Sequence, residues 1–309
     1  MKVLVTCPPM LGMIDYFRPI FEQHSVEVTA PKVVQTLRVE ELKVIVPQHD
    51  GWIIGDDPAT REVFAAGKAG QLKAAVKWGI GVDNVDFAAC KDLGIPITNT
   101  PNMFGGEVAD IAVGYVIALA RETFQIDKGI RQGQWPKPRG ISLSDKIVAL
   151  VGYGDIGKNT AKRMLAADMK VIAYDPAAPD SPGLAAVQRA EWPNRVEEAD
   201  FIVVTCSLTP SSRHIVNAEV LAKVKPGVRV VNVGRGPVID EPALEAALQS
   251  GNVHSAALDV FEVEPLPMES YLRTHPRCIL GSHNASNTSD AVVRTSEIAI
   301  RKLMEFLYG

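Results

Sequence analysis

The sequence is poor in cysteine, with four in 309 residues: Cys7, Cys90, Cys206 and Cys278. Their spacing fits neither a zinc-binding pattern nor a C-x-x-C redox pair, and a chain of this size rarely depends on a disulfide framework. We therefore expect four free thiols, no metal site and a protein of a reducing compartment, the cytoplasm.

Long apolar runs and basic segments are also absent. The most apolar helix candidate, residues 108–120, falls short of the ~20 residues that span a bilayer and contains Asp110. The apolar run in MKVLVTCPPM is too short for a signal peptide and is interrupted by Cys-Pro-Pro. The formal net charge is -4, and lysine and arginine are spread along the chain. A membrane and nucleic acid are therefore poor candidates for partners.

The content of 47% hydrophobic and 22% charged residues is typical of a globular protein, and the length suggests two domains. Short β-rich runs alternate with helical stretches in two series, which predicts parallel pairing and α/β sheets. The first series has predicted strands at 2–6, 26–30, 51–55, 72–78 and 95–100. The second has predicted strands at 147–151, 170–174, 201–205, 228–233, 255–260 and 278–282.

Helices are predicted at 14–24, 107–121, 155–167, 217–223, 241–249 and 288–308. Residues 131–140 are rich in Pro, Gly and Arg and are predicted to form a loop, and the segment TNTPN at 98–102 is predicted to cross between the domains. In the last helix, Val292, Ile298, Leu303 and Phe306 are expected to pack on the first domain.

The stretch VALVGYGDIGK at 148–158 contains a G-x-G-x-x-G pattern between a predicted strand and a predicted helix. In that context Gly152 permits a tight turn, Gly154 lets the backbone approach a pyrophosphate, and Gly157 lets the helix lie close to the strand. The helix start then offers N–H groups to the phosphates. The pattern predicts dinucleotide binding; the alternative is a tight turn without a ligand.

The next strand ends at Asp175, near the spacing expected for an acid that accepts hydrogen bonds from the adenosine ribose. A carboxylate there would repel a 2′-phosphate, and no arginine follows directly. The sequence therefore favours NAD over NADP.

Three side chains are candidates for the chemistry of a nicotinamide enzyme, because each follows a predicted strand. His283 can exchange a proton, and Arg235, between two glycines, can grip a carboxylate. Glu264 can hold an imidazole in its protonated form, and Asp259 can do so at longer range. Each also has a purely structural interpretation. The histidine can be hydrogen-bonded within the protein, the arginine can be solvated at the surface, and the acids can cap a loop.

The other histidines are weaker candidates. His254 precedes its strand, so it belongs to the wrong end of the sheet. His214 lies in a loop, where it can flank an adenine but is more readily a helix cap.

The set VGYGDIG, Asp175, NVGRG, LDVFEVEP and GSH, in this order, resembles the D-isomer-specific 2-hydroxyacid dehydrogenases. KWGIGVDNVD at 77–86 and TNTPN resemble that family's substrate loop and crossover. The resemblance implies a Rossmann NAD-binding domain at 100–287, inserted in a flavodoxin-like α/β substrate domain at 1–99 and 288–309. It implies an active site in the cleft, which closes by a hinge motion.

The resemblance also implies roles for single residues. His283 would be the acid/base, Glu264 its partner, and Arg235 the ligand of the substrate's carboxylate and carbonyl. Substrate contacts are assigned to Ile80, Gly81, Asn102, Arg235 and, from a second subunit of a homodimer, Trp135. Cofactor contacts are assigned to Gly152, Gly154, Asp155, Ile156, Gly157, Asp175, Cys206, Thr209, Val233, Gly234 and Asp259.

The sequence departs from the family pattern at two points. Ser282, not proline, precedes His283, and Asn284 follows it, which changes the hydrogen-bond setting of the histidine. Gly234 stands where alanine or serine is common, which is expected to leave extra room near the nicotinamide.

The implied reaction is reversible hydride transfer between NAD(H) and a small 2-keto acid such as glyoxylate or hydroxypyruvate. Glu264 argues against a formate dehydrogenase, in which glutamine is usual. D-3-phosphoglycerate dehydrogenase is the alternative, but Asp56 and Asp57 after the third strand would repel a substrate phosphate unless basic residues of a neighbouring subunit compensate. The basic residues that could compensate are Arg131, Lys137 and Arg139. No long C-terminal regulatory domain is expected, which also speaks against a phosphoglycerate dehydrogenase.

An alternative of another class is an NAD-sensing, corepressor-like binding protein.

Overall fold

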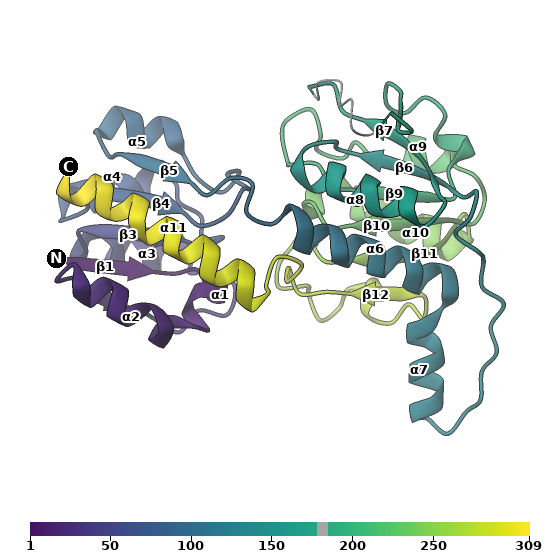
Figure 1. The fold of residues 1–309 in the computed structure, drawn as a ribbon, viewed down its shortest axis with the longest axis horizontal. Helices are drawn as coiled ribbons and strands as arrows, with labels where there is room; N and C mark the ends of the chain where they lie inside the picture. The colour runs from purple at the N-terminus through teal and green to yellow at the C-terminus, as the bar shows by residue number, and fades with distance from the viewer. Residues whose placement is uncertain (178–184) are drawn as a thin grey trace. The chain divides into compact units, whose positions relative to one another are not determined.

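The computed structural model describes residues 1–177 and 185–309, which form two compact units of parallel sheet and helix (Figure 1). Unit 1 comprises Met1–Phe104 and Asn287–Gly309, and unit 2 comprises Gly105–Ser286. The boundaries lie at 104/105 and 286/287, whereas the sequence predicted 99/100 and 287/288. Residues 100–104 stay with unit 1 because Gly79 N–H donates to Thr100 Oγ1 (2.7 Å) and Phe104 packs on Trp78 with ring centroids 5.1 Å apart.

Unit 1 contains a five-stranded parallel sheet in the order β2-β1-β3-β4-β5, the flavodoxin-like order. The central strands are apolar on both faces, as expected where helices cover a parallel sheet. The strands are β1 Lys2–Val5, β2 Glu27–Thr29, β3 Gly51–Ile54, β4 Ala74–Lys77 and β5 Ile97–Asn99. The helices are α1 Pro8–Leu11, α2 Ile14–Gln23, α3 Val39–Ile45, α4 Arg61–Ala69, α5 Phe87–Leu93 and α11 Ser289–Tyr308.

The C-terminal helix α11 returns to the sheet of unit 1 and packs on β3 and β4 (Figure 1). The Thr288 side chain caps its start by accepting from Ala291 N–H, and Trp78 Nε1–H donates to Ser296 Oγ (3.0 Å). Val292 and Leu303 are buried as predicted, but Phe306 is 37% exposed. The prediction for Phe306 was wrong because the buried stripe continues through Leu303 and Met304, and Phe306 lies to the side of it.

Unit 2 contains a seven-stranded parallel sheet in the order β12-β11-β10-β9-β6-β7-β8, a Rossmann order with one further strand at the edge. Both sheets confirm the predicted fold class. The strands are β6 Ile147–Val151, β7 Lys170–Tyr174, β8 Gln188–Arg189, β9 Phe201–Val204, β10 Val228–Asn232, β11 Val253–Leu258 and β12 Cys278–Leu280. The helices are α6 Gly105–Arg121, α7 Thr123–Arg131, α8 Asp155–Ala166, α9 Ala218–Lys223 and α10 Glu241–Ser250.

Two elements of unit 2 were not predicted. β8 is a two-residue edge strand, and α7 begins at a left-handed Glu122 (φ 52°) and projects from the end of α6 (Figure 1). The loop that follows α7 carries Trp135. No helix in the described parts of the chain is long and apolar enough to cross a membrane.

Candidate active site

The glycine-rich turn between β6 and α8 has the shape that a dinucleotide requires. Gly152 has φ +96°, and a Cβ atom there would lie 2.6 Å from the Cys206 amide nitrogen. A Cβ atom at Gly157 would collide with the Gly152 carbonyl, so this glycine brings α8 against the turn. Around the Cβ position of Gly154, by contrast, there is no atom within 4 Å. The turn is thus closed toward the protein and open where a pyrophosphate would approach.

The start of α8 presents backbone N–H groups at this turn. Lys158 N–H is bonded to the Gly154 carbonyl (2.9 Å), and the amides of Asp155, Ile156 and Gly157 precede the first helical hydrogen bond. The Asp155 carboxylate is engaged elsewhere, because Asn159 Nδ2 donates to its Oδ1 (3.2 Å). Asp155 and Ile156 therefore suit a phosphate through their main chain.

Asp175 lies directly after β7, where its carboxylate is oriented by main-chain donors. Tyr153 N–H donates to Oδ2 (2.8 Å) and Ala177 N–H donates to Oδ1 (2.9 Å). Carboxylate oxygens accept more than one hydrogen bond, so Asp175 can also receive ribose hydroxyls. Arg189 of β8 donates to the Asp175 carbonyl (2.9 Å), a contact that the sequence did not reveal because β8 is so short.

Four further residues assigned to the cofactor follow β9 and β10. Thr209 caps a turn, since its Oγ1 accepts from Ser212 N–H (3.1 Å), and Cys206 lies against Gly152. Val233 is buried. The expected extra room at Gly234 does not exist, because a Cβ atom there would lie 2.6 Å from the Cys206 carbonyl oxygen.

The Arg235 turn is fixed by two residues that the sequence analysis did not single out. Buried Asn232 at the end of β10 accepts from Gly234 N–H (3.0 Å) and donates from Nδ2 to the Arg235 carbonyl (3.0 Å). A Cβ atom at Gly236 would collide with the Phe261 carbonyl, so the turn lies directly on the loop that follows β11. These contacts bring Arg235 beside the segment that carries Glu264.

Glu264 joins that loop to His283. Its Oε1 accepts from Phe261 N–H (2.9 Å), and its Oε2 lies 2.8 Å from His283 Nδ1. Both side chains are mostly buried, with 21% exposure each. Nδ1 thus faces the carboxylate, and Nε2 is the ring nitrogen that points away from Glu264. A carboxylate in this position orients an imidazole and favours its protonated form.

Asp259 anchors the main chain around His283. Its carbonyl accepts from His283 N–H (2.7 Å), and its carboxylate accepts from the amides of Asn284 (3.2 Å) and Ala285 (2.8 Å). Burial raises the pKa of Asp259, whereas these amide donors oppose the shift. The contacts hold His283 in a left-handed conformation, φ 54°. The unusual neighbour Asn284 therefore acts here through its main-chain amide.

The predicted substrate loop lies in unit 1, after β4. The Gly79 carbonyl accepts from Thr100 N–H (3.3 Å), which ties the loop to the chain after β5. Among the described residues, no oxygen accepts from the N–H groups of Ile80 or Gly81. Asn102 is exposed with φ 58°, and Trp135 is 79% exposed in the loop after α7 of unit 2.

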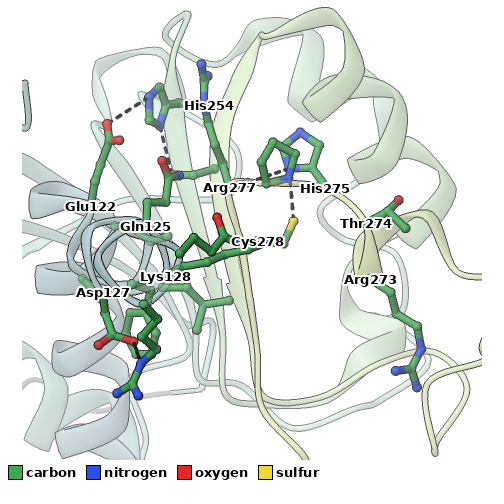
Figure 2. A pocket seen from close by; sticks show the side chains of 18 residues that line it. Glu122, Gln125, Asp127, Lys128, His254, Arg273, Thr274, His275, Arg277 and Cys278 are labelled. Atoms are coloured by element: carbon green, nitrogen blue, oxygen red, sulfur yellow. Dashed lines mark hydrogen bonds and ion pairs between the residues drawn. The ribbon is translucent and has the colours of Figure 1, made fainter. Parts of the chain in front are cut away.

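His214 and His254 lie outside the set around His283. The His214 ring does not cap a helix as expected; its Nε2 lies 2.5 Å from Glu262 Oε1. His254 lines a pocket of about 560 Å³ at the amino-terminal ends of β11 and β12, together with Glu122 and Arg277 (Figure 2). Burial and the nearby arginines lower the pKa of His254 to about 4. As predicted, this residue is at the end of the sheet opposite to His283.

Comparison with known proteins shows the family to which the chain belongs. The sequence model of the D-isomer specific 2-hydroxyacid dehydrogenase NAD binding domain matches residues 113–285. The chain belongs to this family. It is 36% identical over 294 residues to a hydroxypyruvate reductase of Thermotoga maritima, covering 93% of both chains. Its structure is similar to that of the TT0316 protein from Thermus thermophilus, with a TM-score of 0.89, 29% identity and coverage of 100% and 97%.

A D-3-phosphoglycerate dehydrogenase of Methanocaldococcus jannaschii is 34% identical over 315 residues, covering 100% of this chain but 58% of that protein. The chain thus spans little more than half the length of this relative. The matches confirm the predicted family, the 2-hydroxyacid oxidoreductase class and NAD as the cofactor. The glycine turn, the α8 amides and Asp175 fit that cofactor.

Proposed function

We propose that this enzyme interconverts a small 2-keto acid, such as glyoxylate or hydroxypyruvate, and the corresponding D-2-hydroxy acid with NAD(H). The observation that carries the proposal is the His283–Glu264 pair, with a 2.8 Å contact beside the Arg235 turn. A pure binding protein has no need of an oriented acid/base next to an arginine.

The proposed chemistry assigns one task to each side chain. Bound NADH supplies the hydride for the carbonyl carbon. His283 donates the proton from Nε2 to the carbonyl oxygen, so the C=O group becomes a C–OH group. Arg235 stabilises the negative charge that develops on that oxygen and holds the substrate carboxylate. In the oxidative direction, neutral His283 accepts the hydroxyl proton.

The amides of Ile80 and Gly81 suit the substrate carboxylate as well. Two adjacent N–H groups without a protein acceptor form a binding position for an anion. Their loop is held by Thr100 and Asn99, so the donors are oriented before a substrate arrives. This proposal assigns the recognition of the common part of every 2-keto acid to main-chain groups and Arg235.

The two acids after β3 bear on the choice between an unphosphorylated and a phosphorylated substrate. The sequence predicted that Asp56 and Asp57 both repel a substrate phosphate. Asp57 is fully buried and accepts from Leu37 N–H (2.8 Å) and Gly55 N–H (3.2 Å), so it does not face a substrate. Of the two, only Asp56 has a partly exposed side chain, at 34%. A phosphorylated keto acid stays the alternative substrate, given the similarity to phosphoglycerate dehydrogenases.

We further propose a homodimer in the cytoplasm. Large apolar side chains are exposed along α6, α7 and the next loop, which supports an interface between two copies. They are Ile111 (36%), Ile117 (41%), Phe124 (55%), Ile130 (43%) and Trp135 (79%). The four cysteines are free thiols, which suits a reducing compartment. Sedimentation of the purified chain tests the dimer: a single monomeric species at micromolar concentration contradicts it.

NADH oxidation at 340 nm with a panel of 2-keto acids tests the function. The panel contains glyoxylate, hydroxypyruvate, pyruvate, 2-ketobutyrate and 3-phosphohydroxypyruvate. We expect turnover of an unphosphorylated acid. Turnover of the phosphorylated acid alone would retain the mechanism and replace the substrate. Silence across the panel, with NADH still binding, would favour the NAD-sensing alternative.

A further inference from the structure

A buried lysine and a partly exposed aspartate form an ion pair at the carboxyl ends of β3 and β4 in unit 1. Lys77 Nζ lies 2.9 Å from Asp56 Oδ1 and donates to the Gly55 carbonyl (2.6 Å). The Lys77 side chain is 2% exposed, whereas the Asp56 side chain is 34% exposed. The ammonium group is thus covered, and the carboxylate is the member that a ligand can reach.

The pair belongs to the same group of loops as the predicted carboxylate-binding amides. β3 and β4 are adjacent and parallel, with Ile54 opposite Lys77. Asp56 therefore leaves β3 at the level where the chain from β4 enters Gly79. Asn84 ties the two loops together by donating from Nδ2 to the carbonyls of Gly55 (3.1 Å) and Asp57 (2.7 Å).

The carboxylate is exposed and the ammonium group is buried, and this difference determines which ligand groups the pair can bind. The accessible carboxylate accepts hydrogen bonds, and Lys77 balances its charge, so a neutral donor such as a hydroxyl fits. A phosphate would meet a carboxylate first and would be repelled. A substrate with a methyl group in place of the hydroxyl would donate no hydrogen bond to the carboxylate. Gln35 Nε2 also donates to Asp56 Oδ2 (3.4 Å), which is a neutral contact.

We propose that Asp56, positioned by Lys77, is a specificity-determining residue that accepts a hydrogen bond from a hydroxyl group on C3 of the substrate. The preferred substrate class is then a 3-hydroxylated 2-keto acid, with hydroxypyruvate as the simplest member. This inference rests on the proposed function. The keto acid group, which all these substrates share, is recognised as proposed above, and Asp56 adds recognition of the substituent at C3, which differs between them.

Two variants test the proposal in the assay with NADH. For Asp56→Ala, the ratio of kcat/KM for hydroxypyruvate to that for pyruvate is expected to fall about tenfold, the usual effect of losing one hydrogen bond to a charged group. For Asp56→Asn, a smaller fall is expected, since the amide oxygen remains an acceptor. Turnover of 3-phosphohydroxypyruvate is expected to rise in Asp56→Ala, because Lys77 loses its masking carboxylate. Asp92→Asn, which neutralises an exposed aspartate paired with Arg61, is the matched control.

The outcomes separate this inference from the proposed function. A wild-type enzyme that reduces no 2-keto acid would overturn the function itself. A wild-type enzyme that reduces them, with an unchanged hydroxypyruvate-to-pyruvate ratio in both Asp56 variants, would overturn the role of Asp56. Equal losses with every substrate, together with a lower melting temperature, would also overturn it and would make the pair purely structural.

Discussion

In unit 2 the side chains predicted to be catalytic lie in short turns after strand ends and stay partly exposed, whereas in unit 1 two charged side chains at the same end of the sheet are almost fully buried. Arg235 and His283 each lie within a few residues of a strand end and are held by main-chain contacts. Asp57 and Lys77 lie at the same end of the other sheet but are almost fully covered. Under the proposed function, the same topology would serve reaction chemistry in one unit and the positioning of loops in the other.

The largest expected effect comes from His283, the predicted acid/base of unit 2. His283→Gln is expected to lower kcat with hydroxypyruvate by about 10²–10⁴-fold, because acid catalysis by Nε2 is lost. NADH binding, measured by fluorescence titration, should persist. His24→Gln, at an exposed site of unit 1, is the control. Retention of wild-type kcat in His283→Gln would remove the histidine from the mechanism.

Two glycines of the cofactor turn are expected to differ in role: Gly152 supports the fold, and Gly154 gives the cofactor room to bind. Gly152→Ala is expected to lower both the melting temperature and NADH affinity, because its Cβ meets the Cys206 amide and φ is +96°. Gly154→Ala has open space, so it should keep the melting temperature of the cofactor-free protein and weaken NADH binding about tenfold or more. Identical behaviour of the two variants would contradict this assignment.

Asp57 tests the buried side of the comparison. Asp57→Asn places an amide donor against the N–H groups of Leu37 and Gly55, so we expect the free energy of unfolding to fall by about 2 kcal/mol. Urea unfolding measures the loss, with Asp92→Asn as the exposed control. An Asp57→Asn protein as stable as the wild type would mean that the buried carboxyl does not organise these loops.

The smallest expected effect is a pH dependence from His254, at the opposite end of the unit 2 sheet. Its pKa falls from 6.5 to about 4 on folding, so the folded state favours the neutral ring. The corresponding stability is present above pH 6.5 and is lost as the pH falls through about 4. After allowance for its partial solvation, we expect about 1 kcal/mol. Urea unfolding at pH 7 and pH 4.5 should show this loss in the wild type and not in His254→Gln.

The sequence predicted best where the signal is local. The strand–glycine–helix pattern around Gly152 and the end of β7 at Asp175 lie within about thirty residues, so their spacing alone indicated the fold and the cofactor. Arg235 and His283 were found because each follows an apolar strand directly. Their roles in this chain remain predictions for the assays above.

The predictions that were wrong or missing depend on contacts between segments that are distant in the sequence. Gly234 was expected to leave room, but Cys206 of another strand's loop fills the space. Asp57 was expected to face a substrate, but residues around Thr6 and Leu37 enclose it. β8 and Arg189 were missed because a two-residue edge strand has no periodicity to detect. Such features depend on packing across the sheet and leave no short pattern in the sequence.

The most direct test of the central claim uses the oxidative direction. NAD⁺ reduction by the wild-type enzyme is measured at 340 nm with D-glycerate and with L-glycerate, and then with D-lactate and L-lactate. A D-isomer-specific 2-hydroxyacid dehydrogenase should oxidise the D-enantiomers and leave the L-enantiomers unchanged. Oxidation of the L-enantiomers, or equal rates with both, would contradict the account.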